Sequence, residues 1–149
     1  MTVVNKGRIT MNKQNPLSES LEDYLETILR LQAEKTVARS KDIADKLNIK
    51  RGSVTGMLKK LADNGLINYE PYGYVTLTPE GKKIASEIEC RHIFLKDFFH
   101  RVLKVDEKTA DRTACRMEHA MDNQTFKKFK HFLKKIDTCP HCDIEPAKN

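Results

Sequence analysis

Cys115, Glu118 and His119 carry three side-chain types that bind transition metals in proteins. On a helix, positions i, i+3 and i+4 share one face, so this thiol, carboxylate and imidazole can reach one ion. Mixed sulfur, nitrogen and oxygen donors suit Fe(II), Mn(II), Co(II), Ni(II) or Zn(II), and they do not suit calcium or magnesium. The spacing therefore predicts a transition-metal site on one helix.

Three residues elsewhere in the chain match this set. Asp23 and Glu26 are three apart in a segment of helical periodicity, so their carboxylates face the same way. His92 lies in a later, longer helical pattern that could pass between these groups. Taken singly, each residue also has a structural interpretation, because an isolated cysteine is often a small core residue and an isolated acid is often solvated. Cys115, Glu118 and His119 in combination favour a metal site.

The C-terminal tail holds a second candidate site in the sequence Cys-Pro-His-Cys, with Cys139, His141 and Cys142. One Cys-x-x-Cys pair can chelate a metal, but a closed tetrahedral zinc site needs four ligands. A symmetry-related chain could complete such a site, or the two thiols could form a redox-active pair. The remaining interpretation is a tail that neither binds a metal nor takes part in redox reactions.

Cys115 and His119 are also the residue types of a nucleophile and its general base. No glycine-rich oxyanion loop or third orienting residue accompanies them, and the i, i+4 spacing suits chelation better than in-line attack. We therefore expect neither an enzyme nor a small organic substrate.

Apolar periodicity predicts the helices that carry these groups. The first spans about Glu19–Ala33, after a capping Ser18 or Ser20. The second begins with Ser40 as its N-cap, and the third spans about Arg51–Asp63. Two short helices joined by a tight turn form a helix-turn-helix unit.

Residues 66–78 are rich in aromatic and β-branched side chains around a Pro-Tyr-Gly turn, which predicts a β-hairpin. A hairpin directly after the second helix of such a unit makes a winged helix. Three more helices are expected, with Thr78, Asp106 and either Asp122 or Asn123 as their caps. They span about Pro79–Val102, from Asp106 to about Met121, and from Asp122 to about Ile136.

The expected fold class is mainly α, with an N-terminal winged helix-turn-helix, a small β-hairpin wing and a following all-helical domain. The expected boundaries are a disordered lead-in at 1–16, the winged helix at 17–80, the helical domain at 81–137 and a Cys-containing tail at 138–149. The apolar residues of the long fourth helix exceed what one domain face needs.

The second helix of a helix-turn-helix pair lies in the DNA major groove, and its first turn meets base edges and phosphates. In this chain that helix and the residue before it hold two hydroxyls and four basic groups, without an acid between them. They are Lys50, Arg51, Ser53, Thr55, Lys59 and Lys60. Alone, such a cluster could be a solvated face, but its setting between a helix pair and a hairpin favours double-stranded DNA. The lysines from Lys127 to Lys135 are expected to form a solvated helix face.

The 149 residues carry a net charge of +6, which permits a polyanionic partner without locating a binding surface. No apolar stretch approaches the roughly 20 residues of a membrane span, and the first residues lack the apolar core of a signal peptide. We expect a cytoplasmic protein with no membrane partner. Its four cysteines are too few for a disulfide scaffold of this size.

Residues 17–136 resemble the DtxR/MntR family of metal-dependent transcriptional repressors. The resemblance rests on Ser-Leu-Glu-Asp-Tyr-Leu-Glu at 20–26, the wing and Thr-Pro-Glu-Gly-Lys at 74–82, Arg91-His92, and Ala-Cys-Arg-Met-Glu-His at 114–119. It implies a homodimer with two winged helices and a helical dimerisation domain. It also implies metal-dependent repression of iron or manganese uptake genes, with Fe(II) or Mn(II) as the metal and Zn(II), Co(II) or Ni(II) as substitutes in vitro.

Carried over to this chain, the resemblance implies a hybrid metal site. Asp23, Glu26, His92, Glu118 and His119 match ligands of the manganese type, whereas Cys115 matches the thiolate of the iron type. Asp23 also takes the place of the methionine that iron sensors have in the first helix.

The chain departs from the iron type at three further positions. Lys96 and Asp111 stand where iron-type members have a second-site glutamate and histidine, and Gly56 replaces a base-reading glutamine. The leading hypothesis is a metal that ties the first helix to the fifth and so favours DNA binding. The alternative is a winged-helix regulator that senses redox state through Cys139 and Cys142.

Overall fold

A computed structural model describes residues 17–135, which divide into two units between residues 83 and 84. The expected lead-in at 1–16 and the Cys139, His141 and Cys142 tail lie outside the described residues. Each unit has its own apolar core, so each is described by itself. Within the described range, no helix has the length and apolar character that a membrane span needs.

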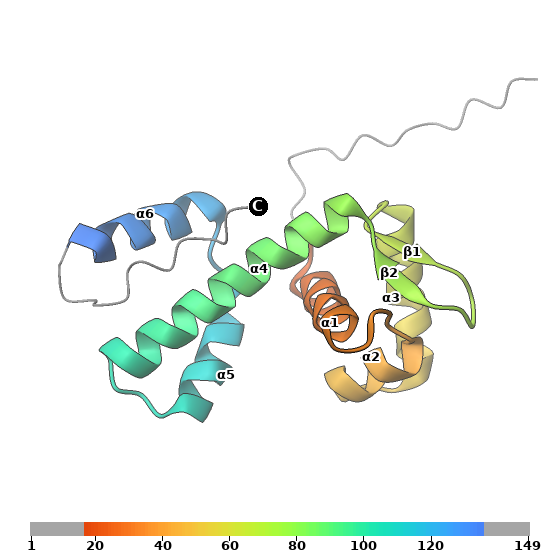
Figure 1. Cartoon of the computed structure of the whole chain (residues 1–149), viewed down its shortest axis with the longest axis horizontal. Coiled ribbons are helices and arrows are strands. Elements are labelled where there is room, and N and C mark those ends of the chain that lie inside the picture. The colour runs from red at the N-terminus through yellow and green to blue at the C-terminus, as the bar shows by residue number, and fades with distance from the viewer. Residues whose placement is uncertain (1–16, 136–149) are drawn as a thin grey trace, which may run out of the picture. The chain divides into compact units, whose positions relative to one another are not determined.

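The first unit begins with three helices, α1 (Glu19–Lys35), α2 (Ser40–Leu47) and α3 (Arg51–Asp63), as Figure 1 shows. This order confirms the predicted helix-turn-helix. The side chains that bury its core come from all three helices and recur at helical spacing, which is why the periodicity located the elements. They include Leu25, Ile28, Leu31, Ile43, Val54, Leu58 and Leu61.

The expected serine caps of α1 and α2 are wrong in detail. Ser18 is the N-cap of α1, but its side chain makes no capping hydrogen bond. Ser40 is the first helical residue of α2, and the extended Arg39 takes the N-cap position instead. Arg39 takes this position because the preceding residue, Ala38, pairs its backbone with that of Val75. This pairing keeps the chain extended up to Arg39.

The predicted wing is a two-stranded antiparallel sheet of β1 (Ile67–Tyr69) and β2 (Val75–Leu77), in which Asn68 lies opposite Thr76. Gly65 enters it with φ +70, a backbone conformation that glycine adopts at little cost. The bridge from Ala38 to Val75 joins the segment before α2 to the wing, so the wing is anchored to the helix-turn-helix.

The helix α4 (Pro79–Asp97) begins with the expected cap, since the backbone N–H of Gly81 donates to Thr78 Oγ1 over 3.1 Å. The Thr78 hydroxyl also donates to the Gly65 carbonyl over 2.7 Å. Gly81 packs directly against the Leu66 carbonyl, and a Cβ at this position would lie 1.9 Å from that oxygen. The start of α4 is therefore fixed against the wing.

The second unit continues with the π-helical turn η1 (Phe98–Val102) and the helices α5 (Glu107–Glu118) and α6 (Asn123–Lys135). The expected α-helix to Val102 is thus wrong over its last five residues. The caps Asp106 and Asp122 are confirmed, because they accept the N–H groups of Thr109 and Thr125 over 3.0 and 2.9 Å. The fifth helix ends at Glu118, earlier than the expected Met121.

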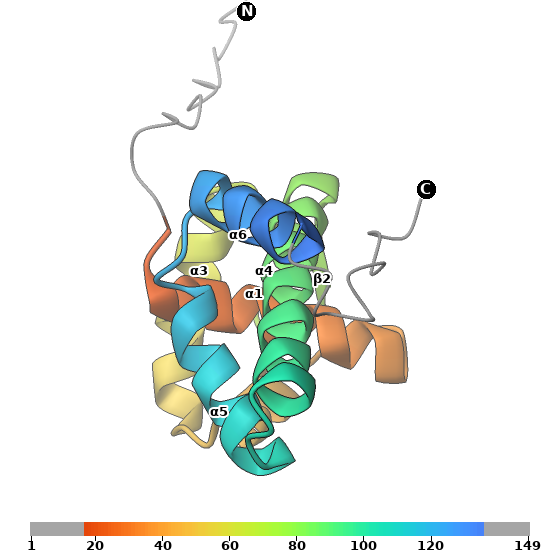
Figure 2. The same ribbon diagram turned by 90° about the vertical axis from the view of Figure 1, so that its left-hand side faces the viewer.

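Both α5 and α6 pack on α4, as Figure 2 shows. Phe94 of α4 meets Phe126 and Phe129 of α6 edge to face, with ring centroids 5.2 and 5.7 Å apart. Leu133 completes this apolar cluster. Ile93, next to Phe94, is half exposed. This agrees with the expectation that α4 has more apolar residues than packing within its own unit needs.

Candidate metal centre and nucleic-acid interface

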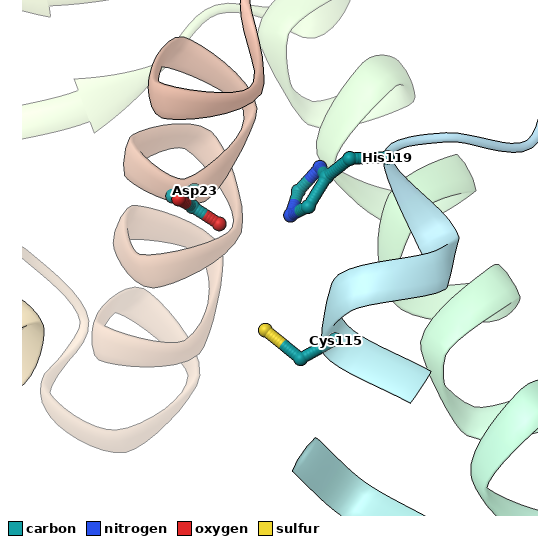
Figure 3. Close-up of side chains that lie close together, drawn as sticks. All are labelled: Asp23, Cys115 and His119. Atoms are coloured by element: carbon teal, nitrogen blue, oxygen red, sulfur yellow. The ribbon is translucent and has the colours of Figure 1, made fainter. Parts of the chain in front are cut away.

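The last turn of α5 brings together two of the predicted metal ligands. Figure 3 shows Cys115 and His119 projecting from the same face of α5, and it also draws Asp23 on α1. Cys115 Sγ and a ring nitrogen of His119 lie within 4.8 Å of each other. Cys115 is an exposed thiol, whereas only 4 % of the His119 side chain is exposed. The i, i+4 spacing thus produces the predicted pairing of thiol and imidazole.

Glu118 is the most unusual residue of this helix end, because its side chain is a fully buried carboxylate. Its Oε2 lies 2.7 Å from His92 Nδ1 on α4. Its Oε1 accepts no hydrogen bond from residues 17–135, and His119 Nε2 lies 3.4 Å away. Burying a carboxylate without full hydrogen bonding is costly, so this oxygen calls for a further partner, and a cation would also neutralise the buried charge.

Together these groups fit a divalent transition metal. Cys115, Glu118, His119 and His92 supply a thiolate, a carboxylate and two imidazoles, which is the mixed donor set expected for Fe(II), Mn(II) or Zn(II). The unpartnered Glu118 Oε1 is the feature that ordinary packing does not explain.

Arg91 positions the same helix end, and sequence reasoning did not assign this role. It is almost fully buried and donates from Nη1 to the backbone carbonyls of Glu118 and Met121, over 2.8 Å in each case. A cation that satisfies the final carbonyls ends a helix favourably, which explains why α5 stops at Glu118. The sequence feature that could have indicated this role is the position of Arg91, a basic residue directly before the candidate ligand His92.

The remaining predicted ligands belong to α1 in the first unit. Asp23 is half-buried, and Glu26, one turn later, is buried. Arg30 donates to Glu26 Oε1 over 2.6 Å, an ion pair between positions one helical turn apart. The spacing of three residues places both carboxylates on one face of α1, as the sequence predicts.

The iron-type second-site positions hold an ion pair. Lys96 Nζ lies 3.2 Å from Asp111 Oδ1, and the hydrogen bond with Asp111 raises the pKa of the Lys96 ammonium. Burial alone would raise the pKa of the Asp111 carboxyl, but hydrogen bonds with His92 and Lys96 outweigh burial and hold that pKa below its usual value. Both groups are therefore charged near neutral pH.

The predicted DNA-reading residues all lie on the exposed side of α3 or at its start. Lys50 is the N-cap, and Arg51, Ser53, Thr55, Lys59 and Lys60 are exposed, whereas Val54, Leu58 and Leu61 face the core. Gly52 and Gly56 lie on the same exposed side, with open space where a Cβ would stand. The exposed side of α3 is therefore basic and carries hydroxyl groups, and at Gly52 and Gly56 it has no side chain.

One basic residue near the wing was not predicted. Arg39 stacks its guanidinium on the Tyr74 ring, 5.0 Å from the centroid, and donates to the Tyr74 hydroxyl over 3.2 Å. With Lys35 and Lys41 it lines a shallow hollow beside the wing. Sequence reasoning missed this group because Arg39 and Tyr74 are far apart in the chain.

Comparison with known proteins identifies both units. Residues 16–75 match the family described as iron dependent repressor, N-terminal DNA binding domain. Residues 78–147 match the family described as iron dependent repressor, metal binding and dimerisation domain.

Curated relatives agree with this result over most of the chain. An HTH-type transcriptional regulator of Methanocaldococcus jannaschii is 41 % identical over 121 residues, covering 80 % of this chain and 97 % of its own length. The transcriptional regulator MntR of Escherichia coli is 39 % identical over 117 residues, covering 78 % of this chain and 75 % of its own.

Solved structures show the same architecture. IdeR of T. acidophilum is 28 % identical, with a TM-score of 0.66 over 85 % of this chain. A manganese-dependent transcriptional repressor solved with manganese is 25 % identical, with a TM-score of 0.69 over 76 % of this chain. The chain spans 58 % and 52 % of these two proteins. On the matches of both units and the identity to MntR, the chain belongs to the DtxR/MntR family of metal-dependent transcriptional regulators.

Proposed function

We propose that this protein is a cytoplasmic, homodimeric repressor that binds a double-stranded DNA operator when Fe(II) or Mn(II) is bound. The genes it controls would encode iron or manganese uptake. The observation that carries the metal dependence is Glu118, a fully buried carboxylate with one oxygen that no hydrogen bond from the described residues satisfies.

The proposed ligands are drawn from both units: Asp23, Glu26, His92, Cys115, Glu118 and His119. Without a cation, the carboxylates and the thiolate repel one another. A bound divalent cation supplies the positive charge that lets all of them share one region. Because the ligands belong to two units, the same residues that hold the cation restrict how the DNA-binding unit is presented.

In this proposal α3 reads the DNA. Arg51 is long enough to donate to a base edge in the major groove, and Ser53 and Thr55 add shorter hydroxyl contacts. Lys59 and Lys60 lie further along the helix, where phosphate contacts are expected. In a homodimer the two recognition helices would enter successive major grooves, about 34 Å apart.

The test compares DNA affinity with and without metal. A labelled duplex is selected from a random pool by the protein with Mn(II), and its affinity is then measured anaerobically with Mn(II), with Fe(II) and with a chelator. A coupling free energy of about 1–3 kcal/mol predicts roughly 5- to 150-fold tighter binding with metal. Equal affinity in all three conditions would overturn the proposal.

Two variants serve as controls. Glu118→Gln keeps the shape of the side chain and removes its charge, so we expect the weak, metal-free affinity in every condition. Arg51→Ala leaves the metal ligands intact, and we expect it to bind Mn(II) normally while it loses DNA affinity with and without metal. If Arg51→Ala abolished the metal dependence of DNA binding and Glu118→Gln kept it, the assignment of the two sites would be contradicted.

A further inference from the structure

His92 lies between two carboxylates of α5, one on each side of its ring. Its Nδ1 is 2.7 Å from Glu118 Oε2, and its Nε2 is 3.1 Å from Asp111 Oδ1. Asp111 and Glu118 are seven residues apart, which places them two turns apart on one face of α5. The imidazole therefore bridges these two turns, with one nitrogen directed to each.

Asp111 is itself held in place by α4. Lys96, one turn after His92 on α4, lies 3.2 Å from Asp111 Oδ1 and 3.4 Å from Glu107 Oε1. Glu107 is one turn before Asp111 on α5. His92 and Lys96 thus both contact Asp111, which leaves this carboxylate little freedom to turn away from the ring.

Two carboxylates flank His92, so with no cation bound either ring nitrogen can donate to its neighbour. A cation bound beside Glu118 would take the Nδ1 lone pair, so the ring proton would lie on Nε2, where the Asp111 carboxylate accepts it. Histidines that bind metals commonly donate their other N–H to a carboxylate in this way. Asp111 would therefore support Nδ1, and not Nε2, as the donor atom of the metal-bound state.

We propose that Asp111, oriented by Lys96, is a positioning residue that fixes which nitrogen of His92 faces the metal. This inference rests on the metal dependence proposed above. Asp111 is not itself a ligand, because the His92 ring separates it from Glu118 and because its Oδ1 already contacts Nε2 and the Lys96 ammonium. The same ammonium repels any cation that would bind next to Asp111.

The variant Asp111→Asn tests the role of the carboxylate. Asparagine has the same shape but no charge, so its carbonyl oxygen is a weaker acceptor for Nε2–H, and its NH₂ group can turn to donate to Nε2 instead. We expect Mn(II) affinity, measured by competition with a fluorescent chelator, to fall about 10- to 100-fold. Because more than half of the Asp111 side chain is exposed, the melting temperature of the metal-free variant should stay close to that of the parent.

A spectroscopic readout separates positioning from a general structural role. In the zinc-loaded parent, the ¹⁵N resonances of His92 should show a proton on Nε2 and none on Nδ1. The matched control Glu107→Gln removes the other partner of Lys96 and should change Mn(II) affinity less than threefold. Lys96→Arg keeps the charge next to Asp111 and should also bind Mn(II) nearly as the parent does.

The outcomes distinguish this inference from the proposed function. Parental Mn(II) affinity in Asp111→Asn, or a zinc-loaded parent with the proton on Nδ1, would overturn the role of Asp111 and leave metal-dependent DNA binding intact. A parent that binds neither Mn(II) nor Zn(II) would overturn both.

Discussion

The polar faces of α3 and α5 are built in opposite ways. On α3 the basic and hydroxyl groups are exposed, and the opposite side of the helix is packed through Val54, Leu58 and Leu61. At the end of α5, Glu118 is fully buried and depends on groups from α4. The α3 face can therefore change without affecting the core, whereas each group around Glu118 bears on both folding and chemistry.

This difference has a functional reason. A DNA-binding face must reach phosphates and base edges, so its side chains remain in water until the complex forms. A metal site gains from burial, because a lower local dielectric strengthens the attraction between ligands and cation. Burial also makes every unpaired group costly, so such a site needs supporting residues such as Arg91.

The largest expected effect comes from Arg91→Ala, which removes the support of the α5 end. Two backbone carbonyls lose charge-assisted hydrogen bonds within a buried region, so we expect the free energy of unfolding to fall by about 3 kcal/mol. Urea denaturation of the metal-free protein measures this change. Arg91→Met, which keeps an apolar side chain of similar length, should be nearly as destabilised. A stable Arg91→Met variant would show that packing, and not the two hydrogen bonds, matters here.

The next effect is on α3, where Arg51→Ala should alter binding without altering stability. Arg51 is exposed, so the free energy of unfolding should change by no more than about 0.5 kcal/mol. The loss of one base-reading arginine should weaken DNA binding by about 1–3 kcal/mol and relax the preference at one base pair. Fluorescence anisotropy with single-base variants of the operator measures both. A loss of stability comparable to that of Arg91→Ala would contradict the contrast between the two faces.

A smaller effect should follow Gly56→Ala, also on the exposed side of α3. A Cβ at this position meets nothing within 4 Å, so the variant should be more stable by roughly 0.5–1 kcal/mol. The added methyl group lies on the face proposed to meet DNA, so DNA affinity should not rise with stability. Gly65→Ala is the matched control, because its φ of +70 makes a side chain unfavourable and should lower stability. A destabilised Gly56→Ala variant would contradict this description of α3.

The smallest effect concerns the exposed caps of α5 and α6. A side-chain hydrogen bond with Thr109 lowers the pKa of Asp106, and the backbone N–H of Thr125 lowers the pKa of Asp122. A carboxyl with a lowered folded-state pKa stabilises the fold above its ordinary pKa of about 3.9, and this stabilisation is lost as pH falls through the lowered value. The melting temperature of the parent should therefore fall in this acidic range.

The double variant Asp106→Asn/Asp122→Asn separates titration from capping. Asparagine is also a good N-cap but does not titrate, so calorimetry from about pH 5 down to about pH 2 should show a shallower acid dependence than in the parent. An equal slope in both proteins would assign the acid dependence to other carboxylates.

Much of the architecture was predictable from the sequence because it depends on local rules. Apolar residues at helical spacing located α1, α2 and α3, and aromatic and β-branched residues around a turn located the wing. The caps Thr78, Asp106 and Asp122 were predictable because each acts on a backbone N–H three residues later.

The errors occurred where a distant group decides a local feature. Ser40 lost its predicted cap position because Ala38 pairs with Val75 in the wing. The sequence did not predict the π-helical turn, because five residues are too few to distinguish the period of a π-helix from that of an α-helix. The end of α5 was misplaced because Arg91, on another helix, donates to the carbonyl of Glu118, the last residue of α5, and to that of Met121 beyond it.

The sequence by itself determined which residues share a helix face, including Cys115 with His119 and Asp23 with Glu26, because that property follows from 3.6 residues per turn. Only the tertiary structure decided that Glu118 is fully buried, that Arg91 holds the end of its helix, and that His92 lies between Glu118 and Asp111. Burial and hydrogen bonding between helices depend on how α4 and α5 pack, and no local spacing encodes that packing.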